Sequence, residues 1–166
     1  MVRGDIQREI LYDDTCRSYS DDNTTRLHYL RSREVHLCDG IYYYRQNPQS
    51  VSNVTNISRF NFLRANEHMQ QQLREMQMPD DILNLHEQVR LNNLIGCYIF
   101  YHQYRSQWTS ADRSYALNEM KRIWHTIEPQ RLKHQMRFGY MFCPSWTLFR
   151  IQEEVFCFLR WLKGVL

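Results

Sequence analysis

Glycine and proline are scarce in this chain, which has only five and four of them among its 166 residues. An all-β fold needs such residues to turn the chain after each short strand. The hydrophobic content of 43% and the charged content of 23% are ordinary for a globular protein, and the length suffices for one domain with a real core. We therefore expect an α+β chain that is mostly α.

The spacing of apolar residues indicates several helices in the second part of the chain. It is clearest in residues 56–77, where apolar side chains recur near a helical period. The segment MPDD (78–81) should end this helix and cap the next, and TSAD (109–112) should cap another. The expected helices span residues 56–77, 82–105, 109–127 and 145–163.

An earlier helix is expected to begin at an acidic pair. Asp21 or Asp22, or the serine before them, can cap a helix that runs to about residue 33. Leu27 and Leu30 give this helix a short apolar side.

A hairpin is expected after this helix. Val35–Cys38 alternates as a strand, Asp39-Gly40 is a turn signal, and Ile41–Arg45 alternates again. Residues 47–55 have the composition of a loop. We therefore expect an organisational boundary near residue 55, which divides the chain into residues 1–55 and residues 56–166.

The cysteine pattern, together with the lack of a recognisable signal peptide, indicates a reducing compartment. The five cysteines, at positions 16, 38, 97, 143 and 157, are odd in number and show no C-x-x-C spacing, which favours free thiols over disulfides or a zinc site. The first 20 residues are polar and acidic, unlike a signal peptide, and no apolar run approaches the length of a spanning helix. A cytoplasmic location is expected.

Basic charge gathers at the C-terminal end. The net charge is +3 overall, whereas residues 131–166 alone carry +4. A total this small does not favour binding to nucleic acid. Within this region, the helix at 145–163 has apolar residues at spacings of three or four, namely Leu148, Ile151, Val155, Phe158 and Leu162.

Two interpretations of this last helix stay open. Its apolar side could lie on an anionic membrane surface, with residues 131–166 making peripheral contact. It could instead pack into the core, with an ordinary solvated face opposite. Glu153 and Glu154 lie on the polar side and weaken the attraction to a membrane.

Residues 5–55 resemble the C-terminal half of the catalytic domain of bacterial family 2 glycosyltransferases, which have the GT-A fold. The resemblance rests on an ordered set of features: the acidic pair, a helix containing NTTRLHYL, the strand REVHLCDG and the segment IYYYRQNPQSVSN. The most specific part is Y-Y-R-x-N-x-x-S. The helices after residue 56 are similar, more weakly, to the C-terminal extension of some bacterial members.

The resemblance implies inverting sugar transfer from a nucleotide-sugar to an acceptor hydroxyl, in the synthesis of surface polysaccharide or other glycans. It implies that Asp22 is the general base, because a carboxylate in a first helical turn is favoured in its ionised form. Asp21, Arg26, Tyr44 and Arg45 are implied to bind substrate.

Each of these residues also has a purely structural interpretation. The acidic pair could serve merely as a cap of its helix, and Arg26 could be a surface or ion-pairing residue. Arg45 could pair with an acid such as Asp39, and Tyr44 could pack.

The donor side of such an enzyme is not found in this sequence. The family holds Mg²⁺ or Mn²⁺ on the nucleotide diphosphate with a D-x-D motif, whereas the acidic pairs here are adjacent residues, and no metal site or cofactor is expected in this chain. We therefore expect a partial glycosyltransferase, at the inner face of the plasma membrane and inactive alone. The alternative is a non-catalytic helical module that binds a protein partner or a membrane surface.

Overall fold

The structure is a computed structural model that describes residues 2–12, 19–36, 39–41, 43, 55–133 and 145–164. This part of the chain is largely helical and none of its residues lies in a strand, which confirms the expectation of a mostly α chain. The elements are α1 (Gly4–Glu9), α2 (Ser20–Arg31), η1 (Ile57–Phe60), α3 (Asn61–Glu75), α4 (Asp80–Tyr104), η2 (Arg105–Gln107), α5 (Ser110–His125), η3 (Pro129–Arg131) and α7 (Trp146–Leu162).

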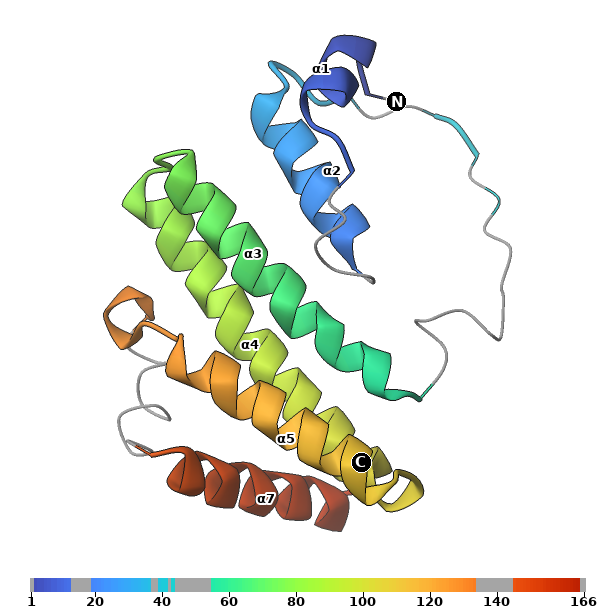
Figure 1. The fold of residues 1–166 in the computed structure, drawn as a ribbon, viewed down its shortest axis with the longest axis vertical. Coiled ribbons are helices and arrows are strands. Elements are labelled where there is room, and N and C mark those ends of the chain that lie inside the picture. Colours follow the sequence, from blue (N-terminus) through green and yellow to red (C-terminus); the bar gives the residue numbers. More distant parts are fainter. Residues whose placement is uncertain are drawn as a thin grey trace.

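The long helix α4 organises the bundle because it contacts α3, α5 and α7 (Figure 1). Burial of large apolar side chains, worth roughly 1.5–3 kcal/mol each, stabilises this arrangement. The main core cluster draws on these helices and on η1, and consists of Phe60, Leu63, Leu94, Cys97, Tyr98, Tyr101, Ala116, Met120, Ile123, Trp124 and Phe149.

Helix ends follow the expected signals in part. Thr109 caps α5 as predicted, because its hydroxyl accepts a hydrogen bond from the Asp112 amide over 3.2 Å. The segment MPDD ends the preceding helix and supplies the N-cap residue of α4, as predicted. This residue is Pro79, which gives no side-chain cap, and Asp80 and Asp81 lie in the first helical turn, where their negative charges interact favourably with the helix dipole.

Helix α2 packs on α3 with a face that is half polar. Leu27 joins a small apolar cluster with Met69, Leu73 and Leu83. Beside it, the buried Asn23 side chain donates a hydrogen bond to the carbonyl oxygen of Ala65 over 2.8 Å. Leu30, expected on the apolar side, is 41% exposed, because the buried face of α2 runs through Asn23, Thr24, Leu27 and His28 instead.

The predicted hairpin is not found in the part of it that the structure describes. Val35, His36, Asp39–Ile41 and Tyr43 have no strand pairing. The side chains of Val35, Ile41 and Tyr43 are 63–87% exposed, so no sheet face is buried against the helices here. Cys38, Tyr42, Tyr44 and Arg45 lie outside the described residues. The division at residue 55 and the GT-A relationship stay predictions.

Candidate functional site

The acidic pair predicted from the sequence lies at the exposed start of α2. The N-cap residue is Tyr19, in the left-handed conformation, so neither Asp21 nor Asp22 occupies the cap position, and the interpretation of the pair as a simple cap is wrong. Arg26 lies one turn later, with its Nη2 4.0 Å from Asp22 Oδ2. The ion-pairing interpretation of Arg26 is therefore confirmed.

This pair of charges is open to water. The side chain of Asp22 is 52% exposed and that of Arg26 is 37% exposed. An ion pair at this distance and exposure contributes little to stability, at most a few tenths of a kcal/mol. Asp22 is thus an accessible carboxylate beside a cation, while Tyr44 and Arg45, the other predicted substrate-binding residues, lie outside the described residues.

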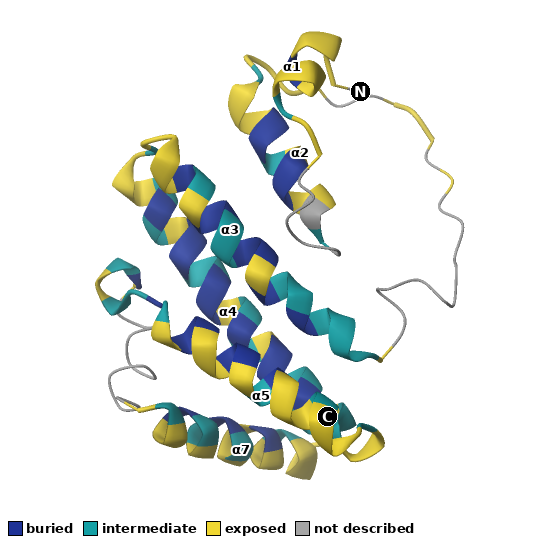
Figure 2. Cartoon of the chain, in the orientation of Figure 1, coloured by how far each residue is buried: buried dark blue, intermediate teal, exposed yellow. Residues whose placement is uncertain are grey.

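The C-terminal helix α7 packs on the bundle through a narrow strip, and the apolar side that the core-packing interpretation placed inward faces outward. Phe149, Glu153 and Cys157 face the bundle and are at most 3% exposed. The apolar residues point away from it, and Figure 2 shows this outer side of α7 largely in the colour of exposed residues. Eight of these residues are 43–60% exposed, and together they are called the apolar face of α7: Leu148, Ile151, Val155, Phe156, Phe158, Leu159, Trp161 and Leu162.

Aromatic packing fixes the first turn of α7 against the bundle. Phe149 meets the ring of Tyr98 on α4 edge-to-face, at 6.0 Å between ring centroids, and lies 6.4 Å from the ring of Trp124 on α5. Trp146 stacks on Phe149 at 5.5 Å. These contacts bury the inner side of the helix start and so determine which side faces outward.

Glu154 ties the middle of α7 to the end of α4. The Tyr98 hydroxyl donates to its Oε1 and the His102 Nδ1 lies 3.0 Å from its Oε2, while Arg105 contacts both oxygens. Burial alone would raise the pKa of Glu154, but the hydrogen bonds from Arg105 and Tyr98 outweigh this effect and lower it. Burial raises the pKa of Tyr98 to about 12, so its hydroxyl stays a donor.

Glu153, its neighbour, is buried with Gln152 as a hydrogen-bond partner and no cation beside it. Its side chain is 3% exposed, and within the described part of the chain its Oε2 has no hydrogen-bond partner. Burial raises the pKa of Glu153 to about 7. The carboxyl group is therefore largely protonated below neutral pH, and neither acid of α7 presents a free negative charge to solvent.

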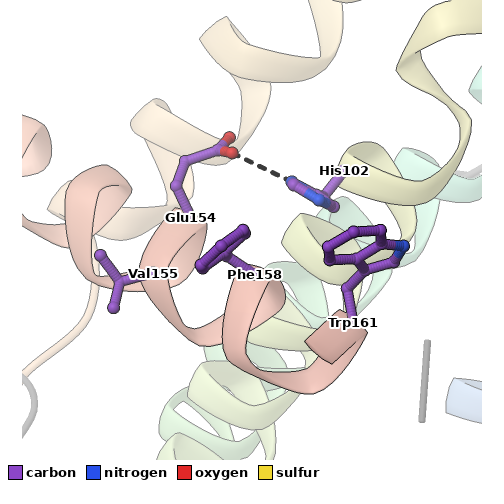
Figure 3. Close-up of a pocket in the computed structure, with 5 residues that line it drawn as sticks. All are labelled: His102, Glu154, Val155, Phe158 and Trp161. Carbon is purple, nitrogen blue, oxygen red and sulfur yellow. Dashed lines mark hydrogen bonds and ion pairs between the residues drawn. The ribbon is translucent and has the colours of Figure 1, made fainter. Parts of the chain in front are cut away.

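A pocket opens where α7 crosses the end of α4. Its volume is about 530 Å³, and it is lined by His102, Glu154, Val155, Phe158 and Trp161 (Figure 3). The polar wall is the His102–Glu154 pair, and the two aromatic rings form the other side, 6.0 Å apart and inclined by 27°. Three of the lining residues, Val155, Phe158 and Trp161, also belong to the apolar face of α7.

Sequence reasoning did not find this pocket. His102 has no metal-binding or catalytic spacing to another histidine, and Glu154 reads as one polar residue among many on an amphipathic helix. The pair forms only because two helices meet in the fold, and its residues are 52 positions apart in the sequence, so no local pattern predicts the contact.

Other site types are not seen in the described residues. They contain no group of three or more His, Cys, Asp or Glu side chains placed to hold a metal ion. None of the helices in this part of the chain combines the length and the apolar character needed to cross a bilayer. No family model, curated protein or solved structure matches the chain.

Proposed function

We propose that this chain is a helical module that binds anionic membrane surfaces through the apolar face of α7. The observation that carries the proposal is the orientation of that helix, which exposes eight large apolar residues side by side. Soluble proteins rarely leave a continuous apolar patch of this kind without a partner. A helix with such a face can lie in the plane of a membrane interface, with its apolar side chains buried among the headgroups and upper acyl chains.

The charges of α7 fit an anionic surface. Glu153 points inward, the charge of the partly exposed Glu154 is balanced by Arg105, and the side chain of Arg150 hydrogen-bonds to buried Tyr98. The charged groups that remain near the C-terminal end of the helix are the half-buried Arg160 and the exposed Lys163, both basic. The two glutamates therefore do not weaken the attraction to a membrane as the sequence suggested. Each cation near the surface adds about 1 kcal/mol of attraction to anionic lipid.

The width of the apolar face favours a membrane over a partner helix. At about 100° per residue, its members cover more than half of the helix circumference. A helix that pairs with another helix needs only a narrow seam, whereas an interfacial helix embeds a broad side. Trp161, Phe156 and Phe158 add aromatic rings, which favour the boundary between headgroups and acyl chains.

Binding to vesicles tests this proposal. The chain should bind vesicles of phosphatidylcholine and phosphatidylglycerol more tightly than vesicles of phosphatidylcholine alone, and added salt should weaken the binding. Ile151→Glu should lower the affinity at least tenfold, because it places a charge in the embedded face. Leu85→Glu on α4 is the matched control, because Leu85 and Ile151 are both 55% exposed, and it should leave binding unchanged.

Two results would overturn the proposal. One is an affinity for anionic vesicles that Ile151→Glu and Leu85→Glu reduce equally, since the apolar face of α7 would then have no special part. The other is a dimer in solution that Ile151→Glu dissociates, with no binding to any vesicle, since a second copy of the chain would then be the occupant of this face.

A second candidate function is sugar transfer, with Asp22 as general base. The observation that favours it is an accessible carboxylate in the first turn of α2, with a cation one turn away. In this proposal Asp21, Arg26, Tyr44 and Arg45 bind substrate, and a nucleotide-binding half supplies the donor. Asp22→Asn in an enzyme that contains both halves should abolish transfer while the melting temperature stays the same. Activity within a few-fold of the parent would exclude Asp22 as the base.

A further inference from the structure

We propose that the pocket between α4 and α7 receives the hydroxylated headgroup of an anionic lipid, such as the glycerol of phosphatidylglycerol. This inference rests on the proposed function and deepens it from a preference for charge to a preference for headgroup chemistry. It is carried by the position of the pocket and by the hydrogen-bonding groups that its wall leaves open.

The pocket adjoins the surface that would meet the membrane. Val155, Phe158 and Trp161 contribute both to its lining and to the apolar face of α7 (Figure 3). When this face embeds, the pocket comes to lie at the level of the headgroups rather than of the acyl chains, because its other wall is polar. A volume of about 530 Å³ is ample for a glycerol headgroup with its phosphate.

All acceptor positions of the Glu154 carboxylate are occupied by donors within the protein. A carboxylate has about four acceptor positions. Here Oε1 accepts from Tyr98 and Arg105, and Oε2 accepts from His102 and Arg105. Its charge is balanced by the Arg105 guanidinium. Glu154 thus orients its neighbours and is not available to bind a cation from a lipid.

His102 supplies the open position. In the neutral ring, Nδ1–H donates to Glu154, which leaves the lone pair on Nε2 as an acceptor. Among the described residues no group donates to Nε2, and the side chain is 25% exposed. The pocket therefore offers one oriented acceptor beside two aromatic rings, which suits a hydroxyl group on a short carbon frame.

The same wall disfavours a headgroup that carries a carboxylate. The carboxylate of a serine headgroup meets two acceptors, Glu154 and the Nε2 of His102. A hydroxyl carries no charge and donates to Nε2 without this repulsion. One hydrogen bond of this kind corresponds to a preference of about threefold to tenfold.

Vesicles of equal charge test the inference. The wild-type chain should bind vesicles with phosphatidylglycerol threefold to tenfold more tightly than vesicles with the same fraction of phosphatidylserine. His102→Leu should lower the first affinity to the level of the second and leave the second unchanged. His125→Leu on α5 is the matched control, because His125 is exposed and lies outside the pocket, and it should keep the preference.

A second variant and a spectroscopic measurement guard against a folding defect in His102→Leu. Trp161→Leu keeps an apolar side chain on the face but removes a ring of the pocket, so it too should lose the preference while it still binds anionic vesicles. In the wild type, the ¹⁵N resonance of His102 Nε2 should shift on binding phosphatidylglycerol bicelles, as expected when this nitrogen accepts a hydrogen bond.

The outcomes separate the two proposals. If the wild type binds neither anionic vesicle, the proposed function is wrong and the inference falls with it. If it binds both equally well and the His102 Nε2 resonance does not move, the inference is wrong while membrane binding through α7 stands.

Discussion

Two adjacent glutamates on α7 have opposite protonation behaviour because of what surrounds each of them. Glu154 accepts hydrogen bonds from three residues of α4 and η2, which outweigh the effect of its burial and lower its pKa. Glu153 is buried with one oxygen lacking a partner, and its pKa rises from 4.5 to about 7. The pair therefore provides an internal comparison, with one acid that stabilises the fold when charged and one that destabilises it.

Glu153→Gln should remove a dependence of stability on pH. Between pH 4.5 and about 7 the unfolded state releases the proton of Glu153 while the folded state keeps it, so the wild type loses stability as pH rises through this window. Above about pH 7 the loss is complete and on the order of 3 kcal/mol. Urea unfolding at pH 5 and pH 8 should show the variant more stable than the wild type mainly at pH 8.

Glu154→Gln is the control at the neighbouring position, with the opposite sign. The folded-state pKa of Glu154 is lowered, so its contribution is present above the unfolded pKa and is lost as pH falls through the folded one. This variant should therefore be less stable than the wild type at pH 8 and approach it in acid. Equal pH dependence in wild type and Glu153→Gln would mean that Glu153 is hydrated, and that α7 does not seat its polar side on the bundle.

At the scale of elements, the junction between α3 and α4 uses an unusual residue for its geometry. Gln77 has a φ of 54°, in the left-handed region that glycine adopts most readily. The Met78 amide bonds to the carbonyl of Leu73 and the Gln77 amide to that of Arg74, which together form a Schellman motif. Met78 also packs against the cluster that contains Leu73, which is the apolar contact typical of this motif.

Gln77→Gly should stabilise the protein by about 0.5–1 kcal/mol, because glycine adopts this conformation without the steric cost that a side chain brings. Gln103→Gly is the matched control: Gln103 is exposed in the last turn of α4, where the same substitution relieves no strain and should cost up to about 1 kcal/mol. Thermal or urea unfolding measures both. A destabilised Gln77→Gly variant would show that residue 77 is not left-handed in solution.

The positions of the helices could be predicted from the sequence, but the direction that their sides face could not. Apolar periodicity and the TSAD cap place α3, α4, α5 and α7 to within a few residues. For α7 the period shows that an apolar stripe exists, yet apolar residues lie over most of its circumference, so either side could be inward. The choice depends on the rings that pack around Phe149 and on the groups that meet Glu154, and both sets of contacts form only in the folded chain.

Local patterns failed where tertiary contacts decide. The buried side of α2 contains Asn23, Thr24 and His28, which periodicity assigns to solvent, because α3 offers partners such as the Ala65 carbonyl. Alternation in Ile41–Arg45 suggested a strand, but Ile41 and Tyr43 are exposed and no neighbouring strand pairs with them in the described residues. The same limitation concealed the pocket, since its residues come from two distant helices.

At the scale of the whole molecule, the attachment of α7 determines whether its apolar face is a fixed feature. Phe149 and Cys157 bury apolar surface against the bundle, and Glu154 joins α7 to Arg105, just after the end of α4. If these contacts hold, α7 unfolds together with α3, α4 and α5, and the face keeps one orientation. If they do not, α7 detaches before the rest and its apolar residues become available in any direction.

A double-mutant cycle on Arg105→Ala and Glu154→Ala tests this attachment. The pair is bidentate and about one-third exposed, so we expect a coupling free energy of about 1–2 kcal/mol, larger than that of a surface ion pair. The exposed pair Arg3 and Asp5 is the control cycle and should show no measurable coupling.

Because α7 contributes Trp146 and Trp161, tryptophan fluorescence and far-ultraviolet circular dichroism should report one coincident transition in the wild type. A fluorescence transition that precedes the loss of helix, together with negligible Arg105–Glu154 coupling, would show that α7 is a separate unit. The pocket would then form only when a membrane holds α7 in place.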